Sequence, residues 1–182
     1  MNRIKKTDIR SLVSVALMSA LISVTSFLTI PFPIPITLQT FGVYFALFTL
    51  GGKSGTLSVL LYICIGAVGL PVFSGFTGGI SRLFDATGGY IFGFLVLAVV
   101  FWMLSAILPK RRMSAAICSA VSLFSLYLTG TLWYAFVYLD GIKTFGYVLS
   151  VGVLPFLFPD ILKILLAYFL ARRLSGIIKI RY

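Results

Sequence analysis

The chain has no histidine and no glutamate, so its only side-chain carboxylates are the aspartates Asp8, Asp85, Asp140 and Asp160. A metal site built from histidine and glutamate is therefore excluded, and we expect neither a resident metal nor a cofactor. General acid–base catalysis would have few groups to use, which argues against an enzyme. No complete phosphate loop of the form G-x-x-x-x-G-K-S/T is present, so we do not expect the chain to hydrolyse ATP by that route.

Charged residues of either sign are also scarce. They make up 10% of the 182 residues, against 60% hydrophobic residues, and the mean hydropathy is +1.10. A soluble domain carries roughly 25% charged residues. No charged residue lies between Ser11 and Gly52, although a membrane-spanning helix needs only about 20 apolar residues. Apolar stretches recur up to the C-terminus, which argues against a cleavable signal peptide. The composition predicts an integral membrane protein.

The apolar stretches predict an all-α bundle of six transmembrane helices in a single membrane domain, residues 1–182. The expected spans are 9–29, 38–51, 55–72, 89–108, 114–137 and 150–171. Cys64 and Cys118 each lie inside one of these stretches, so they suggest neither a disulfide framework nor a metal cluster.

The net charge of +11 comes from short clusters of lysine and arginine between the apolar stretches. They form no continuous basic face, so we do not expect nucleic-acid binding. Clusters precede the first span and follow the second, fourth and last spans. The positive-inside rule then places both termini in the cytoplasm, as expected for a multi-pass protein of the cell membrane with an even number of spans.

Asp160 and Lys163 are the exception to the apolar character of the last span. Residues three apart share one face of a helix, so both charges can project toward one point. By the helical rise, Asp160 lies about 18 Å from Arg172, which places it in the outer half of the membrane. Pro155 and Pro159 lead us to expect Asp160 in the first turn of the regular helix. Charges at this depth indicate a functional site; the alternative is an ion pair that only neutralises itself.

Three other segments have unusual composition. Residues 30–37 contain Pro31, Pro33 and Pro35, which predicts an extended outer loop that either connects two spans or covers a pocket. Residues 75–90 contain two diglycines, which indicate backbone close to a ligand or to another helix. Ala16 and Ala20 form a small-xxx-small spacing that allows another helix to approach closely; ordinary packing is the alternative.

Four segments in register resemble the BioY family, the biotin-specific S-components of energy-coupling factor (ECF) transporters. They are Ile30-Pro31-Phe32-Pro33-Ile34-Pro35-Ile36-Thr37-Leu38-Gln39-Thr40, residues 60–73, Thr87-Gly88-Gly89-Tyr90 with Gly93-Phe94, and Val153-Leu154-Pro155-Phe156 with Asp160-Ile161-Leu162-Lys163. The similarity covers essentially the whole chain. Where the family often has a glycine before the aspartate, this chain has Pro159.

The resemblance implies a six-helix protein that captures biotin from outside and delivers it through a transmembrane coupling subunit and two cytoplasmic ATPases. It implies that Asp160 and Lys163 contact biotin and that the glycine-rich segment closes the pocket. Tyr44, Phe73 and Tyr90 are candidates for the apolar walls, and Arg82 or the backbone at Gly88 and Gly89 for the biotin carboxylate. Gln39 and Gly79, within the matching or closing segments, complete the candidate set, with Ala16 and Ala20 for docking to the coupling subunit.

Three other functions stay open at this point. An S-component for another vitamin would differ only in its pocket. A stand-alone secondary transporter would use the Asp160–Lys163 pair as a proton or substrate relay, although no internal repeat is evident. A small membrane enzyme would use Asp160 as its acid or base, against the thin inventory of titratable groups.

Overall fold

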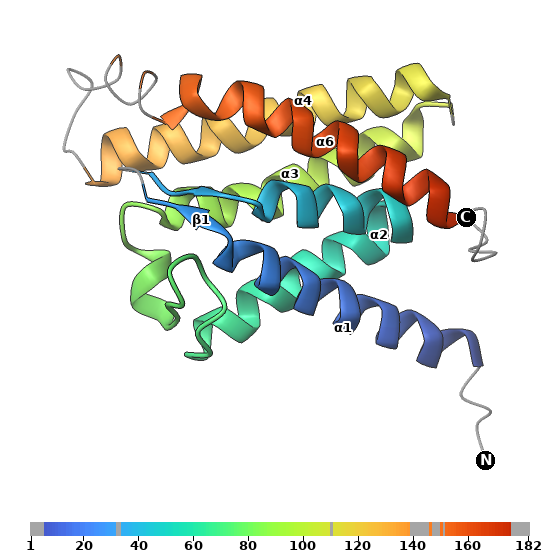
Figure 1. The fold of residues 1–182 in the computed structure, drawn as a ribbon, viewed down its shortest axis with the longest axis horizontal. Coiled ribbons are helices and arrows are strands. Elements are labelled where there is room, and N and C mark those ends of the chain that lie inside the picture. The colour runs from blue at the N-terminus through green and yellow to red at the C-terminus, as the bar shows by residue number, and fades with distance from the viewer. Residues whose placement is uncertain are drawn as a thin grey trace.

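The computed structural model describes residues 6–31, 34–109, 111–138, 146, 150 and 152–175. These residues contain five helices that are long and apolar enough to cross a membrane. The helices are α1 (Lys6–Phe27), α2 (Gln39–Ala67), α3 (Gly88–Ile107), α4 (Arg112–Trp133) and α6 (Leu154–Ser175). They lie roughly side by side along the long axis of the molecule (Figure 1). The prediction of a helical, multi-pass membrane protein is confirmed.

The expected count of six helices is not shown, because the segments 38–51 and 55–72 form one element, α2. Gly51 interrupts α2 with φ 79° and ψ 169°, a conformation that glycine adopts readily. A Cβ at Gly55 would lie 2.8 Å from Cα of Leu47, and Gln39 reaches Tyr62 through a 3.0 Å hydrogen bond. An unbroken helix would separate residues 39 and 62 by about 34 Å. The two arms of α2 therefore fold back on each other at Gly51.

The second arm of α2 is shorter than the expected span, which ran to residue 72. It ends at Ala67, followed by Gly69 with φ 114°. A glycine in the left-handed region just past the last turn is a common helix terminator. Residues 68–87 then form an irregular segment that contains the short 3₁₀ helix η1 (Ile80–Leu83).

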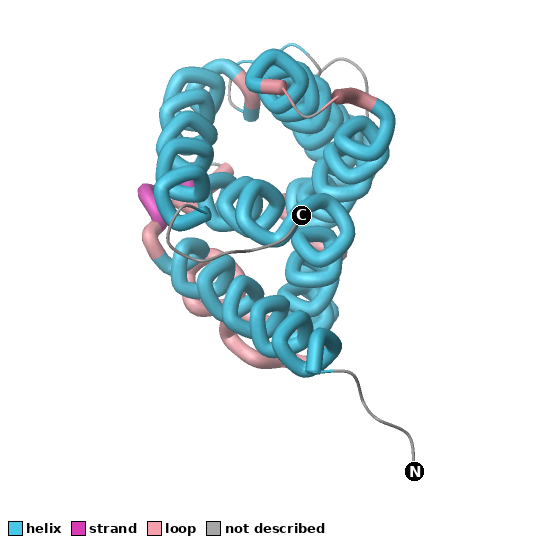
Figure 2. Tube along the Cα trace, turned by 90° about the vertical axis from the view of Figure 1, so that its right-hand side faces the viewer, coloured by secondary structure: helices cyan, strands magenta, loops and turns pink. Residues whose placement is uncertain are grey.

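Two short strands at the ends of the proline-rich segment pair as a small antiparallel hairpin. Strand β1 (Thr29–Ile30) pairs with β2 (Ile36–Thr37), with Thr29 opposite Thr37 and Ile30 opposite Ile36. The hairpin and the segment 68–87 lie at one end of the bundle, and the described termini lie at the other (Figure 1). Figure 2, seen from the end with the termini, shows the helices grouped around a common axis.

Helix α6 is regular from a point earlier in the sequence than its prolines suggest. The helix starts at Leu154, so Asp160 lies in its second turn. The expectation that Asp160 lies in the first turn is wrong. Pro155 falls in the first turn, where a missing N–H costs nothing, and Pro159 is accommodated inside the helix. Helix α4 is followed by the π-helical turn η2 (Tyr134–Tyr138).

Candidate binding site

Asp160 is the centre of a buried polar cluster at the α4–α6 side of the bundle. Its side chain is 3% exposed, and its Oδ1 accepts a 2.8 Å hydrogen bond from Nζ of Lys163, which is 11% exposed. Its Oδ2 accepts a 2.8 Å hydrogen bond from the hydroxyl of Tyr127 on α4. The i,i+3 spacing does bring Asp160 and Lys163 together, as the sequence predicts. Burial strengthens such charge-assisted bonds.

This cluster forms part of the wall of a cavity of about 50 Å³. The lining comes from the hairpin, from four helices and from the segment before α3: Ile34, Pro35, Thr37, Gln39, Thr40, Ser74, Thr87, Tyr90, Ile91, Phe94, Leu126, Tyr127, Phe156, Asp160 and Lys163. Pockets for drug-sized ligands measure roughly 300–1,000 Å³. A ligand of that size therefore requires the walls to move apart.

Gln39 supplies a second polar group from the start of α2. The side chain is buried, and its Nε2 donates a 3.0 Å hydrogen bond to the hydroxyl of Tyr62 on the second arm of the same helix. The side-chain carbonyl oxygen of Gln39, Oε1, has no donor among the described residues, so it can accept a hydrogen bond from a ligand. The neighbouring Thr40 is also buried and lines the cavity.

Tyr90 of α3 lines the cavity and contacts both α4 and the backbone just before α6. Its ring lies against Gly130 of α4, where an added Cβ would overlap the ring atoms. Its hydroxyl donates a 3.3 Å hydrogen bond to the carbonyl of Gly152, just before α6. Two glycines on separate elements thus leave room for one tyrosine in the cavity wall.

The irregular segment 68–87 is attached to the body of the protein at several points. Ser26 of α1 donates a 2.5 Å hydrogen bond to the carbonyl of Val72. The ring of Phe73 packs edge-on against Tyr62 at 5.5 Å between centroids, and an added Cβ at Gly66 would overlap it. Gly66 also accepts a 2.8 Å hydrogen bond from the N–H of Gly79, whose φ is 99°.

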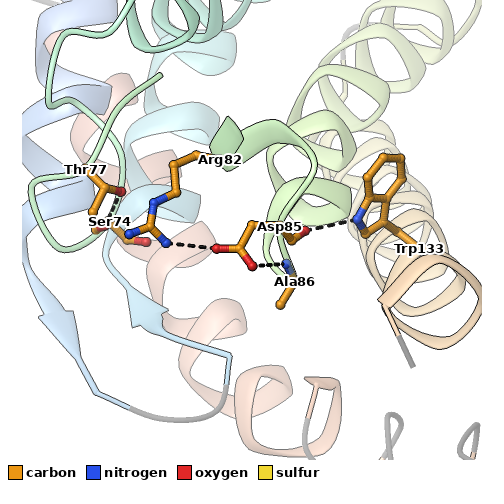
Figure 3. A network of polar contacts seen from close by, with 6 residues as sticks. All are labelled: Ser74, Thr77, Arg82, Asp85, Ala86 and Trp133. Atoms are coloured by element: carbon orange, nitrogen blue, oxygen red, sulfur yellow. Dashed lines mark hydrogen bonds and ion pairs between the residues drawn. The ribbon is translucent and has the colours of Figure 1, made fainter. Parts of the chain in front are cut away.

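Arg82 and Asp85 form an ion pair that organises the end of this segment. Nη1 of Arg82 lies 2.9 Å from Oδ2 of Asp85, and the two side chains are 43% and 39% exposed. Oδ1 of Asp85 accepts a 2.7 Å hydrogen bond from the N–H of Ala86, and its carbonyl accepts a 3.1 Å bond from Nε1 of Trp133. Figure 3 shows how this network links the segment to the end of α4.

The structure brings only part of the predicted set to the cavity. Asp160, Lys163, Gln39 and Tyr90 line it. Six others do not: Tyr44, Phe73, Arg82, Gly79, Gly88 and Gly89. Tyr44 is buried in the core. Its hydroxyl donates a hydrogen bond to the backbone carbonyl of Ser119 and is also hydrogen-bonded to the hydroxyl of Ser122.

Gly88 and Gly89 have close protein neighbours. An added Cβ at Gly88 would overlap the carbonyl of Leu83, and one at Gly89 would overlap Trp133. The close backbone approach expected for the diglycine is thus made to the protein in this structure. Tyr127 is the main cavity residue that the sequence reasoning missed. It lies in an apolar span with no local motif, and only the tertiary fold places it against Asp160.

Ala16 and Ala20 of α1 are not among the residues that line this cavity. Both are exposed, whereas Val15 and Ser19 beside them are buried. The small-xxx-small spacing therefore faces away from the core of the chain.

A model of the BioY family matches residues 1–179. The chain belongs to the BioY family. The resemblance expected from the sequence is confirmed. The biotin transporter BioY of Thermotoga maritima is 38% identical over 168 residues, which are 91% of this chain and 96% of that protein. A probable biotin transporter BioY of Pyrococcus horikoshii is 40% identical over 163 residues, covering 89% of this chain and 94% of that one.

Two solved structures have a similar fold. The S-component for biotin from an ECF-type ABC transporter superposes with a TM-score of 0.80 at 27% identity, covering 97% of this chain and 95% of that one. The S component of a bacterial ECF transporter superposes with a TM-score of 0.62 at 17% identity, over 93% of this chain and 98% of that one. The second likeness supports the fold alone.

Proposed function

We propose that this chain captures biotin and delivers it across the membrane as the substrate-binding S-component of an ECF transporter. The observation that carries the proposal is the buried cluster of Asp160, Lys163 and Tyr127 in the wall of a cavity, in a chain of the BioY family. The relatives are transporters. A small membrane enzyme is therefore set aside.

The chemistry of the cluster suits the ureido group of biotin, which has two N–H donors and one carbonyl acceptor. A carboxylate has about four lone-pair positions, so Asp160 can keep both of its present bonds and still accept N–H groups. Lys163 has three donors, of which one is bonded to Asp160. Its remaining N–H groups can bind the ureido carbonyl.

The rest of the vitamin would meet the other cavity walls. Tyr90, Phe94 and Phe156 offer apolar surface for the sulfur-containing ring and the valeryl chain. The biotin carboxylate would be held by Arg82 or by backbone N–H groups near Gly88 and Gly89, with Gly79 and Phe73 in the closing segment. Binding then requires the segment 68–87 or the hairpin to move, because the present cavity is about 50 Å³.

We further propose that six segments cross the membrane, with the two arms of α2 counted separately and both termini in the cytoplasm. The first arm, residues 39–50, spans only about 18 Å as a helix. In this proposed topology Lys53 and the α3–α4 turn lie on the cytoplasmic side, as the positive-inside rule favours.

Delivery requires partners that supply energy. We propose that a transmembrane coupling subunit and two cytoplasmic ATPases assemble with this chain and that the exposed Ala16–Ala20 face of α1 docks to the coupling subunit. The chain itself needs no cofactor, since biotin is its cargo.

Equilibrium binding of labelled biotin to the purified protein tests the proposal, with riboflavin and thiamine as competitors. We expect biotin alone to bind at or below about micromolar concentration, equivalent to roughly −8 kcal/mol. Competition by another vitamin would indicate an S-component of different specificity. Uptake without any ATPase partner, abolished by collapse of the proton gradient, would indicate a secondary transporter instead.

A further inference from the structure

Two cavities outside the candidate site adjoin each other on the side of the bundle where α2, α4 and α6 approach. The first, the basic cavity, has a volume of about 720 Å³ and lies where α2 is broken, α3 ends and α4 begins. The second, the apolar groove, has a volume of about 500 Å³ and runs between α4 and α6. The two share Phe48, Arg112, Ala115 and Tyr168.

Four cationic side chains line the basic cavity: Lys53, Arg111, Arg112 and Arg172. No carboxylate is among its described lining residues. The ion pairs of the described chain join Arg82 to Asp85 and Lys163 to Asp160, and neither involves Lys53, Arg111 or Arg112. The described lining of the basic cavity therefore carries an excess of positive charge.

Two helix starts add to this positive potential. Arg112 begins α4, and no side chain caps its first turn. The second arm of α2 begins after Gly51, at Gly52 and Lys53, which also line the cavity. Free N–H groups at a helix N-terminus favour a bound phosphate.

The apolar groove distinguishes a lipid from a soluble anion. Apart from Arg112 at its mouth, its walls are alanine, leucine, isoleucine and aromatic residues with a single serine, Ser119. The groove extends along α4 to Tyr127 and along α6 to Leu157. A cationic cavity that opens into a long apolar groove matches a phosphate headgroup joined to an acyl chain.

We propose that the basic cavity and the apolar groove together bind one anionic phospholipid. Its phosphate lies among Lys53, Arg111, Arg112 and Arg172, and one acyl chain lies between α4 and α6. Tyr127, which bonds to Asp160, lines both this groove and the candidate binding cavity. The end of the acyl chain therefore contacts Tyr127 from the side opposite the binding cavity. The lipid site does not depend on the identity of the cargo.

Native mass spectrometry of the detergent-solubilised protein tests the proposal with phosphatidylglycerol and phosphatidylcholine of the same chains. We expect phosphatidylglycerol to bind at least about tenfold more tightly, because the choline cation of phosphatidylcholine cancels its phosphate charge, whereas each basic side chain near a lipid of net negative charge contributes about fivefold. The double variant Lys53→Gln/Arg112→Gln should remove this preference. Arg173→Gln, a charge loss on the same α6 turn but outside the cavity lining, should retain it. Ala120→Trp should fill the groove and weaken both lipids, whereas Val121→Trp, beside it on α4 but outside the groove, should not.

Equal binding of the two lipids to the unaltered protein would overturn the proposal. So would glycerol 1-phosphate binding as tightly as the lipid, which would indicate a soluble phosphate site. If Lys53→Gln/Arg112→Gln left lipid binding unchanged but prevented co-purification of partner subunits, the basic cavity would be a protein-docking surface and the lipid assignment wrong.

Discussion

Asp160 of α6 and Tyr127 of α4, 33 residues apart in the sequence, are joined by a 2.8 Å hydrogen bond. The other carboxylate oxygen accepts a 2.8 Å hydrogen bond from Nζ of Lys163. A pair that only neutralised its own charges would need no third partner and no cavity. Here the hydroxyl of Tyr127 fixes the plane of the carboxylate on one side while the ammonium fixes it on the other. The carboxylate is thus oriented before a ligand arrives, which lowers the cost of binding.

Tyr127→Phe tests this orientation. The change removes one hydroxyl and keeps the ring, so packing in α4 is preserved. A hydrogen bond to a charged group contributes about 1.5–3 kcal/mol, and we expect biotin affinity to fall by at least about tenfold. Equilibrium binding of labelled biotin to the purified variant measures the change.

Tyr44→Phe is the matched control for that experiment. Tyr44 also loses a buried hydroxyl, but its bonds go to Ser119 and Ser122 and it does not line the cavity. We expect a lower thermal midpoint with biotin affinity changed by less than about threefold, since about 1 kcal/mol of a neutral bond is lost from the fold. Comparable losses of affinity in both variants would mean that Tyr127 acts through stability alone.

Asp160→Asn and Lys163→Met should each weaken biotin binding, by about tenfold to a hundredfold, because each leaves a buried charge without its partner. The double variant removes both contacts to the ureido group but buries no unpaired charge, so its loss should be smaller than the sum of the two single losses. Isothermal titration with the four proteins gives the coupling energy. Fully additive losses would show that the two residues bind biotin independently of each other.

Asp85→Asn provides the control, because it breaks a partly exposed ion pair and keeps Arg82, a candidate for holding the biotin carboxylate. Exposed pairs contribute about 0–1 kcal/mol, so breaking this one should change affinity only slightly. A large loss with Arg82→Gln alone would instead support contact between Arg82 and the biotin carboxylate.

Local patterns were sufficient for part of this fold and part of the site. Apolar length predicted the helices within a few residues, and i,i+3 spacing predicted the contact between Asp160 and Lys163. Gly51 was harder to interpret, because a single residue with positive φ reverses the chain and the helical state resumes at once. The role of Tyr127 depends on how α4 packs near α6, and no periodicity within α4 encodes that relationship. Tyr44 and Phe73 were predicted to form cavity walls from their residue type, but both pack into the core.

Gly130→Ala should impair the site through Tyr90. Alanine favours a helix over glycine by about 1 kcal/mol, but here its Cβ would overlap the Tyr90 ring. Displacing that ring breaks its bond to Gly152 and alters the cavity wall. We expect a lower thermal midpoint and weaker biotin binding, measured on the same purified sample.

Gly93→Ala is the comparison for Gly130→Ala, because it adds a methyl group to the same α3–α4 interface. Its nearest contact is Cδ1 of Leu126 at 2.8 Å, the end of a side chain that can rotate away. We expect a smaller loss of stability, and a loss of biotin affinity only as far as Leu126, which also lines the cavity, is displaced. If Gly93→Ala is the more damaging variant, the interface is stiffer at Leu126 than at Tyr90.

The two arms of α2 give a direct test of topology. In a background without Cys64 and Cys118, Lys53→Cys and Phe76→Cys each introduce one thiol at an exposed position. Six spans place residue 53 on the cytoplasmic side and residue 76 outside, so a membrane-impermeant maleimide should label intact cells only at residue 76. Labelling of both after membrane permeabilisation is the accessibility control. Labelling of residue 53 in intact cells would contradict the six-span arrangement.

Ala16→Trp and Ala20→Trp should separate docking from binding. Both positions are exposed on α1, so the added indole does not enter the core or the cavity beside Asp160. We expect normal biotin binding by the purified variants, but loss of co-purification with the coupling subunit and loss of uptake in cells, because the bulk prevents close helix approach. Met103→Trp on the exposed face of α3 adds a similar ring elsewhere and should retain both activities. Loss of biotin binding in Ala16→Trp would assign this face of α1 to the protein's own packing, and retained co-purification would move the docking surface to another helix.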